Sequence, residues 1–122
     1  METLVVEPVY EFHPLGVQLR GRPAVLRYYE RVQREYSPLV EASTLLELFA
    51  GPAGAVLEYA IHLRVDRERW DERLVATMPI QGEHFAGERI HSSERVLRLL
   101  LGEMLDEAQP IPPAAGGESP TR

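Results

Sequence analysis

Residues 9–29, VYEFHPLGVQLRGRPAVLRYY, change their hydrophobic pattern part-way along, which separates a strand from a helix. Residues 5–13 are rich in valine and aromatic residues and predict a first strand, interrupted by one proline and ended by a second. Residues 15–22 contain two glycines and are predicted to form a loop. A helix is predicted over residues 23–36, because a proline suits its first turn and its apolar side chains recur at helical spacing.

Long alternating runs follow this helix and predict a meander of antiparallel strands. The predicted strands cover residues 40–50, 55–65, 72–85 and 89–92, and the last turn between them is predicted over residues 86–88. In the second strand, the apolar side chains from Leu57 to Leu63 occupy every second position and predict one buried row. The third strand is apolar on both faces, so we expect both faces to be covered. Because no helix remains for the second face, we expect a homodimer formed through the outer face of these strands.

The last helix is predicted to begin after Ser93, whose hydroxyl suits an N-cap. Its predicted apolar face consists of Leu97, Leu100, Leu101 and Met104. The order of strand, helix, four strands and helix predicts an α+β fold in which helices cover one face of an antiparallel sheet. Residues 1–107 are predicted to form this domain. Residues 108–122 hold four of the ten prolines of the chain and are predicted to be a flexible tail.

The composition excludes several classes of chemistry. All 13 basic residues are arginine, so there is no lysine for Schiff-base catalysis, and the absence of cysteine excludes thiol nucleophiles and disulfides. A net charge of −6 argues against nucleic acid and anionic membranes as partners, since both demand a basic surface. The chain has no apolar run of membrane-spanning length and no signal-peptide pattern, so a cytoplasmic location is expected. His13, His62, His84 and His91 lack the spacing of metal ligands on one element, so neither a metal nor a cofactor is expected.

Residues 9–29, the segment MPIQGEHFAGERI at 78–90 and the closing helix together resemble the nuclear transport factor 2-like superfamily. Within it, the SnoaL-like polyketide cyclases and the ketosteroid isomerases are the most similar groups, and the resemblance covers about residues 4–107. It implies a cone-shaped, curved antiparallel sheet packed on helices, the α+β barrel or cystatin-like fold, with an apolar pocket at one end. It also implies a homodimer through the outer face of the sheet. Members usually begin with one or two helices, and no residue of this chain matches the oxyanion-stabilising tyrosine that the isomerases carry there.

The resemblance implies catalytic roles for polar residues. His13 stands before a proline where the isomerases place the aspartate that shuttles the substrate proton, and its unperturbed pKa of about 6.5 suits a base. Gln81 matches the aspartic acid that donates a hydrogen bond to the enolate. Glu83 is expected on the same strand face as Gln81, where burial would raise its pKa and let it act as an acid or base beside His13. The alternatives are a structural histidine, a glutamine that only orients a ligand, and a surface glutamate.

Phe12, Tyr59 and Phe85 are candidate contacts for an apolar ligand, with ordinary core packing as the alternative. The leading hypothesis is a small-molecule pocket of the SnoaL and ketosteroid-isomerase type. Such a pocket would catalyse isomerisation, cyclisation or dehydration of an apolar carbonyl compound by acid–base proton transfer.

Two other functions stay open. A non-catalytic ligand-binding or dimeric assembly module is the alternative from another class. An epoxide hydrolase-like reaction is the third, and its family needs an Asp–Arg–Asp set around the pocket. Asp66, Asp71 and Asp106 are all predicted in turns or near the end of the chain.

Overall fold

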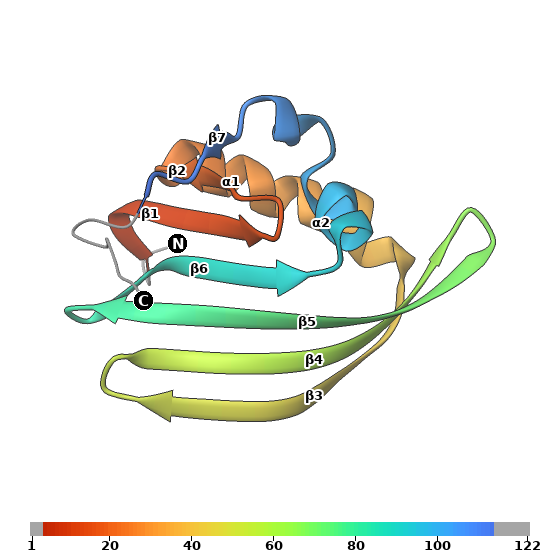
Figure 1. Cartoon of the computed structure of the whole chain (residues 1–122), viewed down its shortest axis with the longest axis horizontal. Coiled ribbons are helices and arrows are strands. Elements are labelled where there is room, and N and C mark those ends of the chain that lie inside the picture. The colour runs from red at the N-terminus through yellow and green to blue at the C-terminus, as the bar shows by residue number, and fades with distance from the viewer. Residues whose placement is uncertain (1–3, 114–122) are drawn as a thin grey trace.

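The computed structural model describes residues 4–113 and shows a curved seven-stranded sheet packed with helices (Figure 1). The strands are β1 (Leu4–His13), β2 (Val17–Arg20), β3 (Val40–Gly51), β4 (Gly54–Val65), β5 (Glu68–Gln81), β6 (His84–Ser92) and β7 (Gln109–Pro110). The helices are α1 (Arg22–Arg31), extended by a π-helical turn (Val32–Tyr36) and a 3-10 turn (Ser37–Leu39), and α2 (Glu94–Leu101), extended by a 3-10 turn (Gly102–Asp106). This architecture confirms the predicted α+β class. None of the helices within residues 4–113 has the length and apolar character needed to cross a membrane.

Neighbouring strands follow the order β3-β4-β5-β6-β1-β2-β7. The meander from β3 to β6 is antiparallel, as its alternating runs predict. β1 lies parallel to β6, so the sheet is mixed rather than wholly antiparallel. This pairing brings the end of β1 beside the end of β6, and it decides which residues meet in the middle of the sheet.

Two glycine-containing segments that were predicted to be a loop and a turn belong to strands. β2 pairs with β1 as a hairpin. Gly16, with a φ of +73°, forms the tight turn between the two strands, and the four residues of β2, VQLR, alternate between apolar and polar types. Residues 86–88 lie inside β6, and the turn before this strand occurs earlier, at Gly82 with φ of +66°. Phe85 therefore belongs to β6 and not to the preceding strand.

The core lies between the helices and the sheet face that they cover, which we call the inner face; the opposite face is the outer face. Of the predicted buried row on β4, Ile61 and Leu63 are buried on the inner face, whereas Leu57 and Tyr59 are only half-buried because they lie beyond the part that the helices cover. The Ser93 hydroxyl caps α2 by accepting a hydrogen bond from the Val96 N–H. The predicted apolar face of α2 is buried, and it joins a core that also contains Tyr10, Phe12, Leu19, Val25, Tyr28 and Ile90.

The C-terminal end of α2 is held by a side chain from α1. Arg31 donates from Nε to the Leu100 carbonyl at 3.1 Å and from Nη2 to the Leu99 carbonyl at 3.2 Å. Its Nη1 also donates to the Glu103 carboxylate at 2.9 Å. Gly102 leaves room for the guanidinium, because a Cβ there would lie 1.9 Å from Arg31 Nη2. This contact ties the two helices together above the core.

β7 extends the sheet beyond β2, with which it pairs antiparallel. The Ile111 N–H also donates to the Gly16 carbonyl at 3.0 Å. The segment that was predicted to be a tail from residue 108 therefore starts inside the sheet, and residues 114–122 lie outside the described part of the chain.

The helices cover only part of the sheet. Both pack against β1, whereas β3 and β4 form the far edge (Figure 1). Large apolar side chains stay exposed at this edge, Leu45 and Leu48 on the inner face and Phe49 on the outer face. The edge thus offers apolar surface on both of its sides.

Candidate functional site

The residues predicted to act together in catalysis lie in two separate places. His13 ends β1, and its partner across the parallel pairing is His91 near the end of β6. Gln81 pairs with His84 at the start of β6, and Glu83 occupies the exposed turn between them. The seven-residue rise from His84 to His91 along β6 corresponds to about 23 Å at about 3.3 Å per residue. The structure therefore does not bring His13 into a common site with Gln81 or Glu83.

His13 belongs to a small cluster on the outer face. Phe12 points inward, so its neighbours in the strand, Glu11 and His13, point outward. The His13 Nε2–H donates to Glu11 Oε1 at 2.9 Å, and the His13 ring stacks on that of His91 with centroids 4.7 Å apart. Burial lowers the pKa of His91, and the neighbouring His13 and Arg89 lower it further. This cluster faces away from the helices and the core.

The three predicted ligand contacts differ in accessibility. Phe12 is 0% exposed, with its ring centroid 5.3 Å from that of Tyr28. Tyr59 and Phe85 are half-buried on the inner face and pack at the margin of the core. A ligand against the inner face can therefore reach Tyr59 and Phe85, whereas Phe12 is a core residue.

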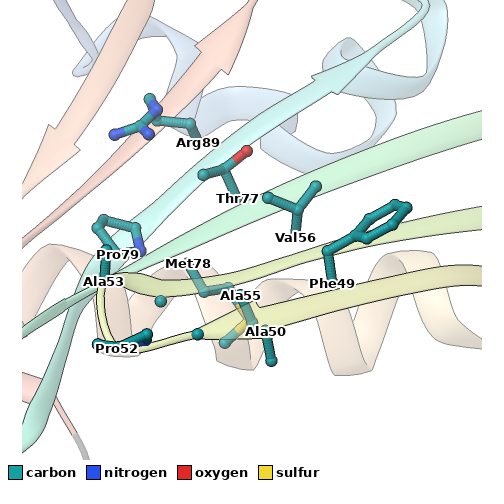
Figure 2. Close-up of a pocket in the computed structure, with 12 residues that line it drawn as sticks. Phe49, Ala50, Pro52, Ala53, Ala55, Val56, Thr77, Met78, Pro79 and Arg89 are labelled. Carbon is teal, nitrogen blue, oxygen red and sulfur yellow. The ribbon is translucent and has the colours of Figure 1, made fainter.

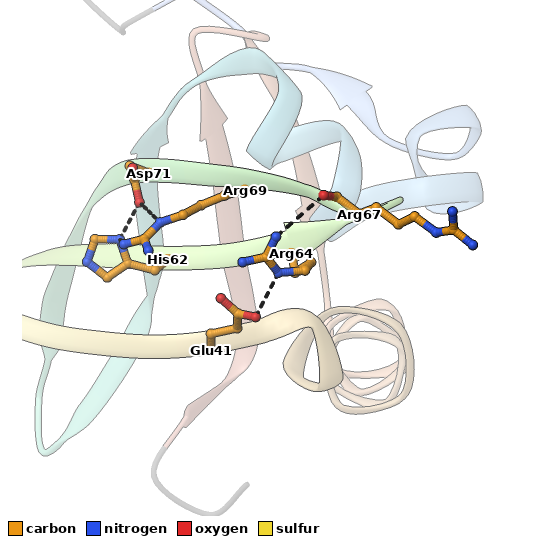
Figure 3. Close-up of polar contacts among 6 residues, drawn as sticks. All are labelled: Glu41, His62, Arg64, Arg67, Arg69 and Asp71. Atoms are coloured by element: carbon orange, nitrogen blue, oxygen red, sulfur yellow. Dashed lines mark hydrogen bonds and ion pairs between the residues drawn. The ribbon is translucent and has the colours of Figure 1, made fainter.

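Charged side chains form two neighbouring groups on the outer face of β3, β4 and β5, one around Asp71 and one around Arg64 (Figure 3). Asp71 accepts hydrogen bonds from Arg69 Nε at 2.8 Å and from His62 Nδ1 at 2.5 Å. These two neighbours, with Arg69 the stronger, hold the pKa of the Asp71 carboxyl below its usual range. Arg64 donates to Glu41 at 2.9 Å. These side chains are in contact with solvent, and exposed ion pairs of this kind contribute only about 0–1 kcal/mol each to the free energy of folding.

The aspartates considered for an epoxide hydrolase-like reaction do not converge. Asp66 lies in the turn between β4 and β5, Asp71 belongs to one of the outer-face groups, and Asp106 lies in the 3-10 turn after α2. Among the residues that the structure describes, no group of three or more histidine, aspartate or glutamate side chains could hold a metal ion.

An acidic side chain lies on the inner face of β6. Glu88 precedes the buried Ile90 by two residues, so both side chains point towards the core. Glu88 is the direct partner of Tyr10 on β1. Burial raises the pKa of the Glu88 carboxyl from its ordinary value of 4.5 to about 7, and the hydrogen bond from the Tyr10 hydroxyl lowers it by a smaller amount. A carboxyl group with such a pKa can accept and return a proton near neutral pH.

Gly87 makes this arrangement possible. Its φ is +138°, and a Cβ at this position would lie 1.9 Å from the Val9 carbonyl oxygen. Only glycine therefore allows β1 to approach β6 so closely. The pairing shifts register between Leu4 and Val9, resumes at Val9 opposite Gly87, and then places Tyr10 opposite Glu88.

Three tyrosines surround the Glu88 carboxyl. The Tyr10 ring lies 5.8 Å from that of Tyr28 and 5.6 Å from that of Tyr29, and the hydroxyls of Tyr10 and Tyr29 are hydrogen-bonded. Burial raises the pKa of all three phenols, and the charge of Glu88 adds to the effect on each. They consequently stay protonated at neutral pH and can act as hydrogen-bond donors.

A hollow of about 500 Å³ opens on the α1 side of this cluster. Tyr29 lines the hollow and is also bonded to Tyr10, so polar groups run from the hollow through two hydroxyls to the carboxyl of Glu88. The other lining residues are Leu26, Glu30, Gln33 and Arg34.

Sequence reasoning missed this acid because it placed Glu88 in a turn, where it would not pair with Tyr10. A signal was nevertheless present, since Glu88 and Ile90 are two residues apart in a strand-like run. The glycine before Glu88 obscured it, because glycine usually marks a turn.

No family model matches the chain, and no curated protein matches its sequence. Solved structures do match its fold. An NTF2-like protein of unknown function from Cytophaga hutchinsonii superposes with a TM-score of 0.67 at 6% identity, over 75% of this chain and 80% of the other. A protein assigned as a SnoaL-like polyketide cyclase from Jannaschia sp. CCS1 gives a TM-score of 0.65 at 11% identity, over 83% and 75%.

A steroid delta-isomerase from Pseudomonas aeruginosa gives a TM-score of 0.64 at 14% identity, over 87% of this chain and 74% of the other. At such identities the likeness concerns the path of the chain, in agreement with the resemblance of residues 9–29 and 78–90. The chain therefore has the nuclear transport factor 2-like fold, which SnoaL-like cyclases and ketosteroid isomerases share.

Proposed function

We propose that the protein binds an apolar carbonyl compound against the inner face of its sheet and catalyses acid–base proton transfer on it. The observation that carries this proposal is the half-buried carboxyl of Glu88, with its pKa of about 7. In its ionised form it takes a proton from the carbon next to the carbonyl group and then returns it to another carbon. Isomerisation, cyclisation and dehydration of such compounds all need this step.

The tyrosines supply the second requirement, a donor for the negative charge that develops on the carbonyl oxygen. Tyr10 is only 2% exposed and is hydrogen-bonded to Glu88, so it orients the carboxyl. Tyr29 lines the hollow, and it donates its proton to Tyr10 while Tyr10 donates to the ionised carboxylate of Glu88. Once Glu88 has taken the substrate proton, Tyr10 can donate to Tyr29 instead, which frees the Tyr29 proton for the carbonyl oxygen in the hollow. The acid–base role thus moves from His13, on the outer face, to Glu88.

The test is turnover of a β,γ-unsaturated ketone, followed by the absorbance of the conjugated product. Glu88→Gln should lower the rate by about 10²–10⁴-fold, the usual effect of losing a general base, with little change in ketone binding. Glu83→Gln in the exposed turn is the matched control and should keep the wild-type rate. His13→Ala separates the two assignments, because a loss of turnover in this variant together with full turnover in Glu88→Gln would contradict ours.

A non-catalytic ligand-binding module is the second candidate. It is supported by the enclosure of the Glu88 carboxyl among tyrosines, an arrangement that also suits a purely structural hydrogen-bond network. Wild-type protein that binds unsaturated ketones without turning them over would favour this candidate.

We also propose that two copies of the chain associate through the outer face of β3, β4 and β5. Val75 is partly exposed near the middle of this face, and the helices of the described residues lie over the opposite face. Sedimentation at micromolar concentration should show a dimer that Val75→Glu weakens, and a monomeric wild type would contradict the proposal.

A further inference from the structure

Four side chains form a row across the outer face of the sheet. Phe49 pairs with Val56, Val56 with Thr77, and Thr77 with Arg89, on the successive strands β3, β4, β5 and β6. Figure 2 shows Phe49, Val56, Thr77 and Arg89 rising on the same side of these strands. Because neighbouring strands lie about 4.8 Å apart, the row is about 14 Å long. It is apolar at one end and cationic at the other.

The row forms part of a hollow of about 390 Å³ near the turn between β3 and β4. Its walls are mostly apolar and include Met78 and Pro79. Phe49 is 64% exposed, although aromatic side chains are mostly buried in folded proteins. Glu88 points to the opposite face, so the hollow is separate from the site proposed for catalysis.

Among the described residues that line the hollow, only Arg89 carries a charge. Within residues 4–113, no carboxylate lies at ion-pair distance from its guanidinium. Its neighbour on β1, Glu11, is hydrogen-bonded to His13 instead. Arg73, on the outer face of β5, is by contrast paired with Glu58 at 3.1 Å.

We infer that this hollow binds an amphipathic carboxylate. The apolar part of the ligand lies along Phe49 and Val56, and its carboxylate accepts hydrogen bonds from the Arg89 guanidinium and the Thr77 hydroxyl. The planar fork of an arginine side chain matches the two oxygens of a carboxylate. The hollow also has the size of ordinary small-ligand sites, about 300–1,000 Å³.

The test compares two probes of the same chain length, decanoate and the uncharged 1-decanol, by calorimetric titration of the full chain. Decanoate should bind saturably, and Arg89→Gln should weaken it by about tenfold or more, since a charge-assisted hydrogen bond is lost. Binding of 1-decanol should be the same in both proteins. Arg73→Gln removes a charge from the same face and should leave the decanoate affinity unchanged. Phe49→Ser should weaken both probes, and this variant should fold because the ring is exposed.

Amide chemical shifts report where the probe lies. Decanoate should shift the signals of Phe49, Val56, Thr77 and Arg89, and leave those of Tyr29 unchanged. Unsaturable uptake, equal decanoate affinity in wild type and Arg89→Gln, or shifts confined to the inner face would each overturn the inference. The inference requires the proposed dimer to leave the turn between β3 and β4 uncovered, so decanoate should bind without dissociating it. Sedimentation of the same samples tests this: a dimer that excludes decanoate and that Arg89→Gln dissociates would assign the hollow to a second copy of the chain.

Discussion

Replacing Glu88 by glutamine removes the carboxyl on the inner face of β6 but keeps its size and its capacity for hydrogen bonding. The pKa of the folded-state carboxyl is about 7, against an ordinary value of 4.5. At about 1.36 kcal/mol per pH unit, this difference corresponds to about 3 kcal/mol of folding free energy. This figure is an upper limit, because Glu88 is partly exposed and solvent screens part of the effect.

The sign follows from proton binding. Below about pH 4.5 the carboxyl is protonated in the folded and the unfolded chain, so its ionisation costs nothing. Between about pH 4.5 and 7 the unfolded chain releases the proton while the folded chain keeps it. The folded state then binds more protons, and the free energy of unfolding falls as the pH rises. Glu88→Gln should therefore be more stable than wild type at pH 8 and lose that advantage by pH 4.5.

Urea unfolding between pH 4.5 and 8, followed by Trp70 fluorescence, measures this difference directly. The free energy of unfolding of Glu88→Gln minus that of wild type should rise with pH by up to about 3 kcal/mol. Glu83→Gln in the exposed turn should give a flat difference over the same range. A flat difference for Glu88→Gln as well would refute the raised pKa, and with it the physical basis of the proposed acid–base role.

Further predictions concern the packing and the turns. Gly102→Ala should lower the free energy of unfolding in urea by about 2–4 kcal/mol, because the added Cβ would displace the Arg31 guanidinium. Gly16 also has a positive φ but open space around it, so Gly16→Ala should cost only about 1 kcal/mol. Equal losses in the two variants would contradict the contact between Gly102 and Arg31. Arg67 has a φ of +70°, so Arg67→Gly should stabilise the hairpin by about 0.5–1 kcal/mol, and a lower melting temperature would disprove this. A chain that ends before Ile111 loses one hydrogen bond to Gly16, so its melting temperature should fall by a few degrees at most; a larger fall would mean that the removed segment contributes further contacts.

The parts of the fold that the sequence predicts are those with an uninterrupted pattern. The row from Leu57 to Leu63 alternates without a break, and the observed β4–β5 pairing is regular along its whole length. The last helix carries its own N-cap at Ser93, so its start needs no tertiary information. β2 and the first half of β6 were misread because Gly16 and Gly87 look alike in sequence, although one forms a turn and the other permits a close approach of two strands.

The candidate site could not be predicted in the same way, because it depends on a contact between distant segments. Tyr10 and Glu88 meet only through the parallel pairing of β1 with β6, and no local pattern specifies that pairing. The resemblance correctly implies the fold. However, Gln81, which it matches with the hydrogen-bonding aspartic acid of the isomerases, lies at the exposed end of β5. Even a correct fold therefore leaves the positions of individual polar side chains to be settled by register.

Register is the decisive property of β6, because Glu88 and Arg89 are consecutive and point to opposite faces. A slip of one residue would exchange them, placing a cation among the tyrosines of the core and an acid in the outer hollow. Gly87 prevents such a slip: any other residue at this position would collide with the Val9 carbonyl, so β1 can pair closely only when the glycine stands opposite Val9. One residue without a side chain thus fixes the chemistry of both faces of the sheet.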